Sequence, residues 1–144
     1  MVISADTSFL FSLYGNDSHT PKTVTWSAGN TDPILISAFN RFELINALRF
    51  AECRKQLPSG SAMTYQNLFI NAISAGRLIE PNLNLSNILA EAHRLSSVHT
   101  LRHGHRAFDI LHVAAAKVMK ASHFLTFDAN QKRLAESEGL IVPI

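Results

Sequence analysis

The sequence predicts an α/β protein, organised as a three-layer α/β/α sandwich around a central parallel sheet. Hydrophobic residues make up 47% and charged residues 17% of the 144 residues, which suits one folded domain with a substantial core. Short apolar strands alternate with helical patterns, as in parallel sheets that are covered on both faces. No repeat, low-complexity tract or linker interrupts the pattern, so residues 1–144 are predicted to form a single domain.

The first half of the chain is predicted to form two strands and four helices. Pro21 suits the first turn of a helix, and Ser37 can cap another helix. The Pro-Ser-Gly stretch at 58–60 is a break, and Gly76 suits a helix end. In order, the predicted elements are a strand at 2–5, helices at 8–13 and 22–28, a strand at 34–36, and helices at 38–53 and 63–75.

The second half continues the same alternation. Ser86 can cap a helix, and a loop containing Gly104 is predicted to lead into the next helix. Gly139 suits the end of the last helix. In order, the predicted elements are a strand at 78–79, a helix at 87–96, a helix at 108–119, a strand at 123–127, a helix at 129–137 and a last strand at 140–142.

The cysteine content and the apolar runs limit the class of protein. Cys53 is the only cysteine, which excludes an internal disulfide and a cysteine-rich zinc site. The longest apolar runs, such as 110–119, are too short to span a bilayer. The first residues lack the basic start and cleavage site of a signal peptide. We therefore expect a cytoplasmic protein with no membrane partner.

Four acidic residues, far apart in the sequence, are predicted to meet at one end of the sheet. Asp6 directly follows the first strand, and Asp128 directly follows the strand before the last helix. Glu43 lies near the start of the helix after the second strand, and Asp109 lies in the first turn of its helix. The loops and helix starts that follow parallel strands converge at the carboxyl ends of those strands, where ligands bind.

Each of these acids also has a purely structural explanation. Asp128 can cap the helix that follows it, and Asp109 can complement a helix dipole. Glu43 can be exposed, although its apolar neighbours are an unusual setting for a solvated acid. Asp6 is the hardest to explain structurally, because it directly follows a buried strand.

A cluster of carboxylates implies a bound cation. Neighbouring carboxylates repel one another, and their pKa values rise unless a cation neutralises them. Oxygen ligands of this type suit Mg²⁺ or Mn²⁺ rather than zinc. Such a metal can orient and deprotonate a water, and it can stabilise the charge that builds on a phosphodiester during in-line displacement.

Positive charge is concentrated in one part of the chain, although the net charge is only +2. No acid lies between Glu91 and Asp109, whereas Arg94, Arg102, Arg106 and four histidines lie there. Such a stretch can attract phosphate beside a metal-binding acid, and Arg102 or Arg106 can hold a phosphate of the substrate. A solvated helix end and loop would have the same composition.

The histidines allow two further interpretations. His112 follows Asp109 by three residues and shares its helix face, so it can touch the substrate; a packed, structural histidine is the favoured alternative. His103 and His105 can in principle bind a soft metal, although no cysteine joins them.

Four short motifs occur in order along nearly the whole chain: Asp6-Thr7-Ser8, Phe42-Glu43-Leu44, Phe108-Asp109-Ile110-Leu111-His112-Val113-Ala114-Ala115-Ala116 and Thr126-Phe127-Asp128. This ordered set resembles the PIN domain, and within it the VapC-type toxins of toxin–antitoxin pairs. The resemblance implies a PIN-like fold and a metal-dependent endoribonuclease. It assigns the four acids to the metal site, and it assigns the hydroxyl groups of Ser8 and Thr126 to its support.

The resemblance also implies partners. These are the RNA substrate, a cognate antitoxin protein and a second copy of the chain in a homodimer. The helices at 38–53 and 63–75 are expected to pack on the sheet by default, although they can also offer a groove to a partner helix.

Several other functions remain open alternatives. A haloacid-dehalogenase-like phosphatase needs a second Asp two residues after the first, where this chain has Ser8. A non-catalytic RNA-binding PIN module would keep the fold without the chemistry. A housekeeping nuclease, acting in RNA processing or on DNA, would have the same fold and the same catalytic chemistry.

Overall fold

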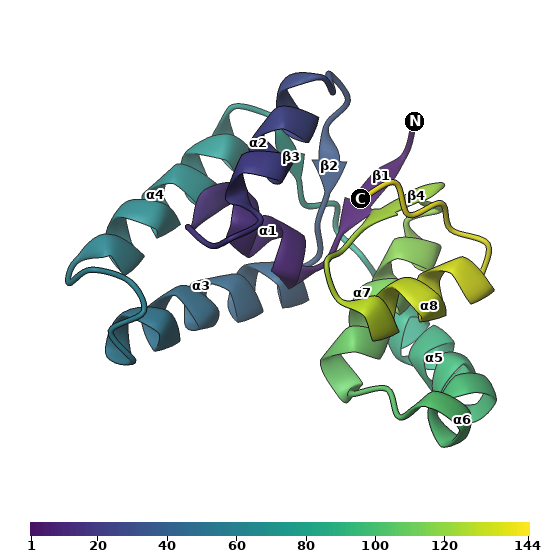
Figure 1. Cartoon of the computed structure of the whole chain (residues 1–144). Helices are drawn as coiled ribbons and strands as arrows, with labels where there is room; N and C mark the ends of the chain where they lie inside the picture. The colour runs from purple at the N-terminus through teal and green to yellow at the C-terminus, as the bar shows by residue number, and fades with distance from the viewer.

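A parallel sheet of four strands lies at the centre of the computed structural model, which describes all 144 residues (Figure 1). The strand order is β3-β2-β1-β4, and every neighbouring pair is parallel. Ile3 pairs with Ile34 on one side and with His123 on the other. The strands are β1 (Ile3–Ala5), β2 (Ile34–Leu35), β3 (Leu78–Ile79) and β4 (His123–Leu125). The predicted fold class is therefore confirmed.

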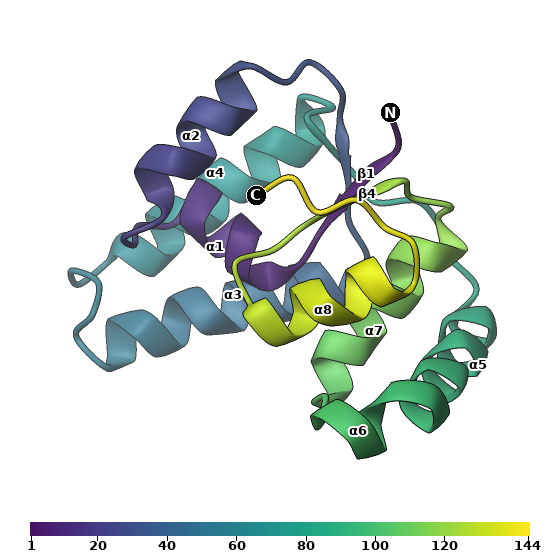
Figure 2. The ribbon, with the colours of Figure 1, turned by 45° about the vertical axis from the view of Figure 1, so that its right-hand side comes forward.

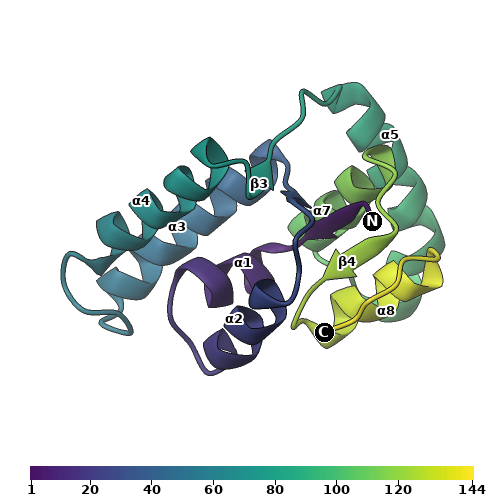
Figure 3. The ribbon, with the colours of Figure 1, turned by 90° about the horizontal axis from the view of Figure 1, so that it is seen from above.

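Helices cover both faces of this sheet. Seen from above, α5 and α7 lie on one side of the strands, and α2 and α8 lie on the other (Figure 3). Helices α3 and α4 form a hairpin that extends away from the sheet, which is clear from two directions (Figures 1 and 2). No helix is both long and apolar enough to cross a membrane. The helices are α1 (Thr7–Tyr14), α2 (Thr20–Ala28), α3 (Ala38–Cys53), α4 (Ser61–Ser74), α5 (Leu85–Leu95), the π-helix η1 (Ser96–Thr100), α6 (Leu101–His103), α7 (Ala107–Val118) and α8 (Ala129–Ser137).

Two aspartates cap the helices that follow the central strands. The Asp6 carboxylate accepts a hydrogen bond of 2.9 Å from the backbone N–H of Phe9 at the start of α1. The Asp128 carboxylate accepts 2.9 Å bonds from the N–H groups of Asn130 and Gln131 at the start of α8. Because β1 and β4 are parallel neighbours, both caps lie at the same end of the sheet.

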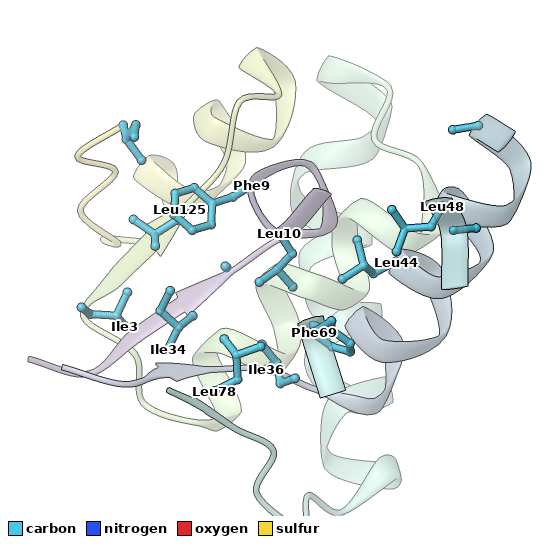
Figure 4. Close-up of a cluster of buried hydrophobic side chains, with 14 of the residues drawn as sticks. Ile3, Phe9, Leu10, Ile34, Ile36, Leu44, Leu48, Phe69, Leu78 and Leu125 are labelled. Atoms are coloured by element: carbon cyan, nitrogen blue, oxygen red, sulfur yellow. The ribbon is translucent and has the colours of Figure 1, made fainter. Parts of the chain in front are cut away.

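Two clusters of buried apolar side chains hold the layers together. The larger one joins the strands to α1, α3 and α4, and Phe9 and Leu10 of α1 are fully buried in it (Figure 4). The other cluster surrounds α7, where the alanines at 114–116 let α5, α8 and the sheet approach closely. Each large apolar side chain buried in this way contributes roughly 1.5–3 kcal/mol. The clusters fix α1, α3 and α7 relative to the strand ends.

The structure differs from three of the local predictions. The N-cap of α5 is Asn84, whose side chain accepts a 2.8 Å bond from the N–H of Ser86, so Ser86 is not the cap. The loop predicted before Gly104 is helical instead, because η1 and α6 continue α5 until Gly104 adopts a φ of 67°. The predicted last strand is reduced to one bridge between His123 and Ile141. Pro143 has no N–H with which to extend that pairing.

A network of charged groups joins the end of α8 to α5, η1 and α7. The carboxylate of Glu138, at the end of α8, lies 2.5 Å from Arg94 of α5, 2.6 Å from His99 of η1 and 3.1 Å from Lys117 of α7. Burial raises the pKa of Glu138, but the hydrogen bonds from these basic groups outweigh it and lower that pKa to about 2. Arg94 also pairs with Glu91. Part of the positive charge predicted to attract phosphate is therefore already neutralised within the fold.

Candidate functional site

The four acids predicted to form a site line a single pocket of about 240 Å³. The pocket opens where the chain leaves β1 and β4 and where α3 and α7 begin. Its walls are mostly polar, and a basic residue lies among the acids. The lining residues are Asp6, Thr7, Ser8, Phe11, Glu43, Ala47, Arg106, Asp109, His112, Asp128 and Gln131.

Asp6 lies at the base of the pocket and is only 2% exposed. Besides the N–H of Phe9, its oxygens accept hydrogen bonds of 2.7 and 2.6 Å from the hydroxyl groups of Ser8 and Thr126. Burial raises the pKa of Asp6 to about 6, although these three hydrogen bonds lower it. No basic side chain pairs with this carboxylate. A cation in the pocket would therefore stabilise its charged form.

Glu43 approaches the pocket from the second turn of α3 and has two donors on one oxygen. Its Oε2 accepts a 2.7 Å bond from the Thr7 hydroxyl and a short bond from His112 Nε2, whereas its Oε1 has no protein partner. Burial raises the pKa of Glu43, but the hydrogen bonds from His112 and Thr7 outweigh it, so the pKa is lowered overall. Glu43 is thus held as a carboxylate with one oxygen unused.

Arg106 bridges the remaining two acids. Its Nε donates to Asp109 Oδ2 at 2.9 Å, and one Nη donates to Asp128 Oδ2 at 3.5 Å. The Arg106 side chain is 77% exposed, so an isolated pairing of this kind contributes little to stability. The positive charge of the guanidinium group offsets the repulsion between the carboxylates of Asp109 and Asp128.

The donor set suits a hard divalent cation, but the side chains as they stand do not surround one. No group of three or more His, Cys, Asp or Glu side chains is arranged to hold a metal ion, at this pocket or around His103 and His105. At the pocket, Arg106 donates hydrogen bonds to the Oδ2 atoms of both Asp109 and Asp128. The buried, unpaired charge of Asp6 and the free Oε1 of Glu43 still fit Mg²⁺ or Mn²⁺ chemistry. Binding would require the guanidinium group to move aside.

The other residues predicted for the site fall into two groups. Ser8 and Thr126 both bond Asp6, and Thr126 also accepts a 3.0 Å bond from the N–H of Asp128. Arg106 lines the pocket, whereas Arg102 is exposed on α6 and does not line it. The ring of His112 is 2% exposed and both of its nitrogens have partners, so the geometry does not favour the predicted contact with RNA.

Three residues around the pocket were not predicted from the sequence. Thr7 bonds Glu43, and Asn40 bonds His112. Gln131 is buried and donates a 2.9 Å bond to the carbonyl oxygen of Asp109. Asn40 had one detectable signal, because it stands three residues after the helix-capping Ser37, where a side chain returns to the cap backbone. The Thr7–Glu43 and Gln131–Asp109 bonds join distant parts of the chain, so no local sequence pattern predicts them.

The fold and the pocket together define a class of protein: an α/β/α sandwich with a carboxylate pocket at the ends of its parallel strands. The family model of the PIN domain matches residues 3–137, so the chain belongs to the PIN domain family. PIN domains are nucleases, and the chain is therefore assigned to a family of phosphodiester hydrolases. No curated protein sequence matches the chain significantly.

Three solved structures share this fold, and one of them is described as a toxin. VapC20 of Mycobacterium tuberculosis, described as a sarcin-ricin loop cleaving toxin, is 16% identical with a TM-score of 0.70, over 96% of both chains. VapBC2 of Rickettsia felis, bound to a promoter DNA fragment, is 18% identical with a TM-score of 0.64, over 99% of this chain and 97% of that one. FitAcB of Neisseria gonorrhoeae is 18% identical with a TM-score of 0.62, over 98% and 96%. At these identities the likeness establishes the fold.

Proposed function

We propose that this chain is a metal-dependent endoribonuclease that hydrolyses RNA phosphodiester bonds. The observation that carries the proposal is the meeting of Asp6, Glu43, Asp109 and Asp128 in one pocket of a PIN domain. These four acids are the proposed metal-binding and catalytic residues, and the cofactor is Mg²⁺ or Mn²⁺. Residues 1–144 act as one nuclease domain.

The mechanism assigns a separate task to each group of side chains. Asp6 and Glu43 would hold the cation, because each has oxygens fixed by hydrogen bonds from the protein. Asp109 and Asp128 would become available as further ligands if Arg106 turned away from them. When bound, the cation would activate a water for in-line attack and stabilise the charge on the phosphate. The freed guanidinium group of Arg106 can then bind a phosphate of the RNA.

The biological role proposed here is the toxin of a type II toxin–antitoxin pair in the cytoplasm. The structures that share the fold include a VapC toxin and two complexes named for toxin–antitoxin pairs, which supports a cognate antitoxin as partner. A homodimer is part of the same proposal. The alternatives are a non-catalytic RNA-binding PIN module and a housekeeping nuclease. An antitoxin reading frame beside this one would separate a toxin from both.

Incubation with total cellular RNA tests the proposed activity directly. The purified chain is incubated with Mg²⁺, with Mn²⁺ or with EDTA, and the 5′ ends of the products are mapped. We expect discrete cuts with a divalent metal and intact RNA with EDTA. RNA that stays intact with both metals would favour the non-catalytic alternative, and equal cleavage in EDTA would contradict the metal dependence.

Replacing Arg102 and Arg106 together by Gln is expected to weaken RNA binding and to reduce its dependence on salt. Each lost phosphate contact lowers the slope of log K against log salt by about 1, so the double variant should lose up to about 2. Binding is measured in an Asp6→Asn background, so that the RNA is not cleaved. The matched control is Arg49→Gln on α3 with Arg54→Gln at the C-cap of α3, which changes the net charge equally. Equal effects of the two pairs would mean that the 102–106 segment is only a solvated surface.

A further inference from the structure

The orientation of the Asn40 side chain is determined by two backbone groups. Its Oδ1 accepts a 2.8 Å bond from the N–H of Ser37, which can only donate. Its Nδ2 donates a 3.0 Å bond to the carbonyl oxygen of Ala5, which can only accept. Asn40 is 1% exposed, so water does not compete for these partners. The amide group therefore cannot be flipped without loss of both bonds.

This orientation determines the tautomer of His112. The Nδ2 of Asn40 also lies 3.2 Å from His112 Nδ1, so an N–H group points at that ring nitrogen. Nδ1 must then be unprotonated, because two donors cannot bond each other. The other ring nitrogen, Nε2, faces two oxygens: Oε2 of Glu43 and, at 3.3 Å, Oγ1 of Thr7. The ring is thus a neutral imidazole that carries its proton on Nε2.

The spacing of residues on α3 allows two of its side chains to contact one ring on α7. Asn40 and Glu43 are three residues apart on α3, so they lie on one face and contact the two nitrogens of the same ring. The ring belongs to α7, one turn after Asp109. The Nδ2 of Asn40 is also bonded to Ala5, the residue before Asp6. These hydrogen bonds therefore link the segments of the chain that carry Asp6, Glu43 and Asp109.

We propose that Asn40 and His112 are positioning residues: Asn40 holds His112 in the Nε2–H tautomer, and His112 orients Glu43 for the metal. Bonds from His112 and Thr7 occupy Oε2 and leave Oε1 for the cation. This arrangement has the same physical basis as the outer hydrogen bonds that orient metal ligands in other proteins. The inference rests on the proposed function in assigning a metal to Glu43, but the tautomer does not depend on it.

Long-range ¹H–¹⁵N correlation of the His112 ring tests the tautomer in the metal-free chain. We expect a protonated-type Nε2 and an unprotonated-type Nδ1. In Asn40→Asp, a carboxylate faces Nδ1 while Glu43 still faces Nε2, so Nδ1 should become protonated as well. The control is Asn71→Asp at an exposed position of α4, which should leave the ring signals unchanged. A protonated Nδ1 in the unaltered chain would overturn the proposal.

Mn²⁺ affinity tests the orienting role of the ring. In His112→Gln, the side-chain amide can still donate to Glu43, whereas in His112→Leu it cannot. Loss of an outer hydrogen bond typically weakens metal binding by about 10–100-fold. We expect titration calorimetry to give about a tenfold or larger loss for His112→Leu, with most of the affinity retained in His112→Gln. Circular dichroism verifies that each variant is folded; if His112→Leu is unfolded, His112→Phe, which keeps a ring but cannot donate to Glu43, takes its place and should show the same loss.

The outcomes separate this inference from the proposed function. Equal Mn²⁺ affinity in a folded His112→Leu variant would overturn the orienting role, even if the chain cleaves RNA. Retained Mn²⁺ binding and the Nε2–H tautomer, in a chain that leaves RNA intact, would overturn the proposed activity and leave the positioning role in place. Absence of Mn²⁺ binding to the unaltered chain would overturn both the orienting role and the metal dependence.

Discussion

Replacing Asp6 by Asn is expected to abolish metal-dependent RNA cleavage while the fold persists. Asn has nearly the same shape and still offers an oxygen to the N–H of Phe9, but it removes the charge at the base of the pocket. Asp109→Asn should have the same effect on cleavage. We expect each variant to lose at least about a hundredfold in rate, which is typical of removing one essential electrostatic group.

The stability of the Asp6→Asn variant provides an independent readout. The pKa of Asp6 is raised to about 6 in the folded chain, above its usual value of 3.8. The folded state therefore binds this proton more tightly, and the metal-free chain loses stability as the pH rises from about 4 to 6. A neutral Asn avoids this loss, so the variant should be at least as stable as the unaltered chain at pH 7.

The matched control is Asp32→Asn, a half-buried carboxylate outside the pocket whose only ion pair is with the N-terminus. Its rate of cleavage should equal that of the unaltered chain. If Asp6→Asn and Asp109→Asn both cleave RNA at the unaltered rate, the four-acid assignment is wrong. Loss of cleavage with a melting temperature well below that of the control would point to misfolding rather than to the site.

Replacing Glu138 by Gln is expected to destabilise the fold by about 2 kcal/mol at neutral pH. The carboxylate is bonded by Arg94, His99 and Lys117, and its side chain is only 10% exposed. A pKa lowered from 4.5 to about 2 corresponds to roughly 3 kcal/mol of folding stability. Solvent around the exposed Arg94 screens the charges and reduces this contribution. Denaturant unfolding at pH 7 measures the difference.

The pH dependence identifies the cause of that loss. Because the pKa of Glu138 is depressed in the folded state, its contribution is complete above about pH 5 and disappears as the pH falls towards 2. The difference between the two proteins should therefore be smaller at pH 3 than at pH 7. Glu136→Gln is the control, because Glu136 is half exposed and lies 3.9 Å from its single partner Lys132. A difference that does not change with pH would show that packing, and not charge, is responsible.

The order of strands and helices could be predicted because it depends on local patterns. Strand 78–79 and helix 129–137 have the predicted bounds, and most other elements agree within a few residues. The errors occurred where the local pattern was ambiguous. Gly104 indicated a break, but the sequence before it contains no residue that forbids a helix, so the chain stays helical up to that glycine. The segment at 140–142 is apolar, but strand pairing depends on a neighbouring edge and on Pro143.

The fold class and the place of the acids follow from the sequence, because Asp6 comes directly after one parallel strand and Asp128 comes three residues after the end of its neighbour. The hydrogen-bond partners of those acids, by contrast, depend on how the helices pack. Arg106 bonds Asp109, which is three residues away, and Asp128, which is 22 residues away, and His112 reaches back 69 residues to Glu43. Hydrogen-bond partners at such separations depend on helix packing and side-chain direction, which no local period or spacing encodes.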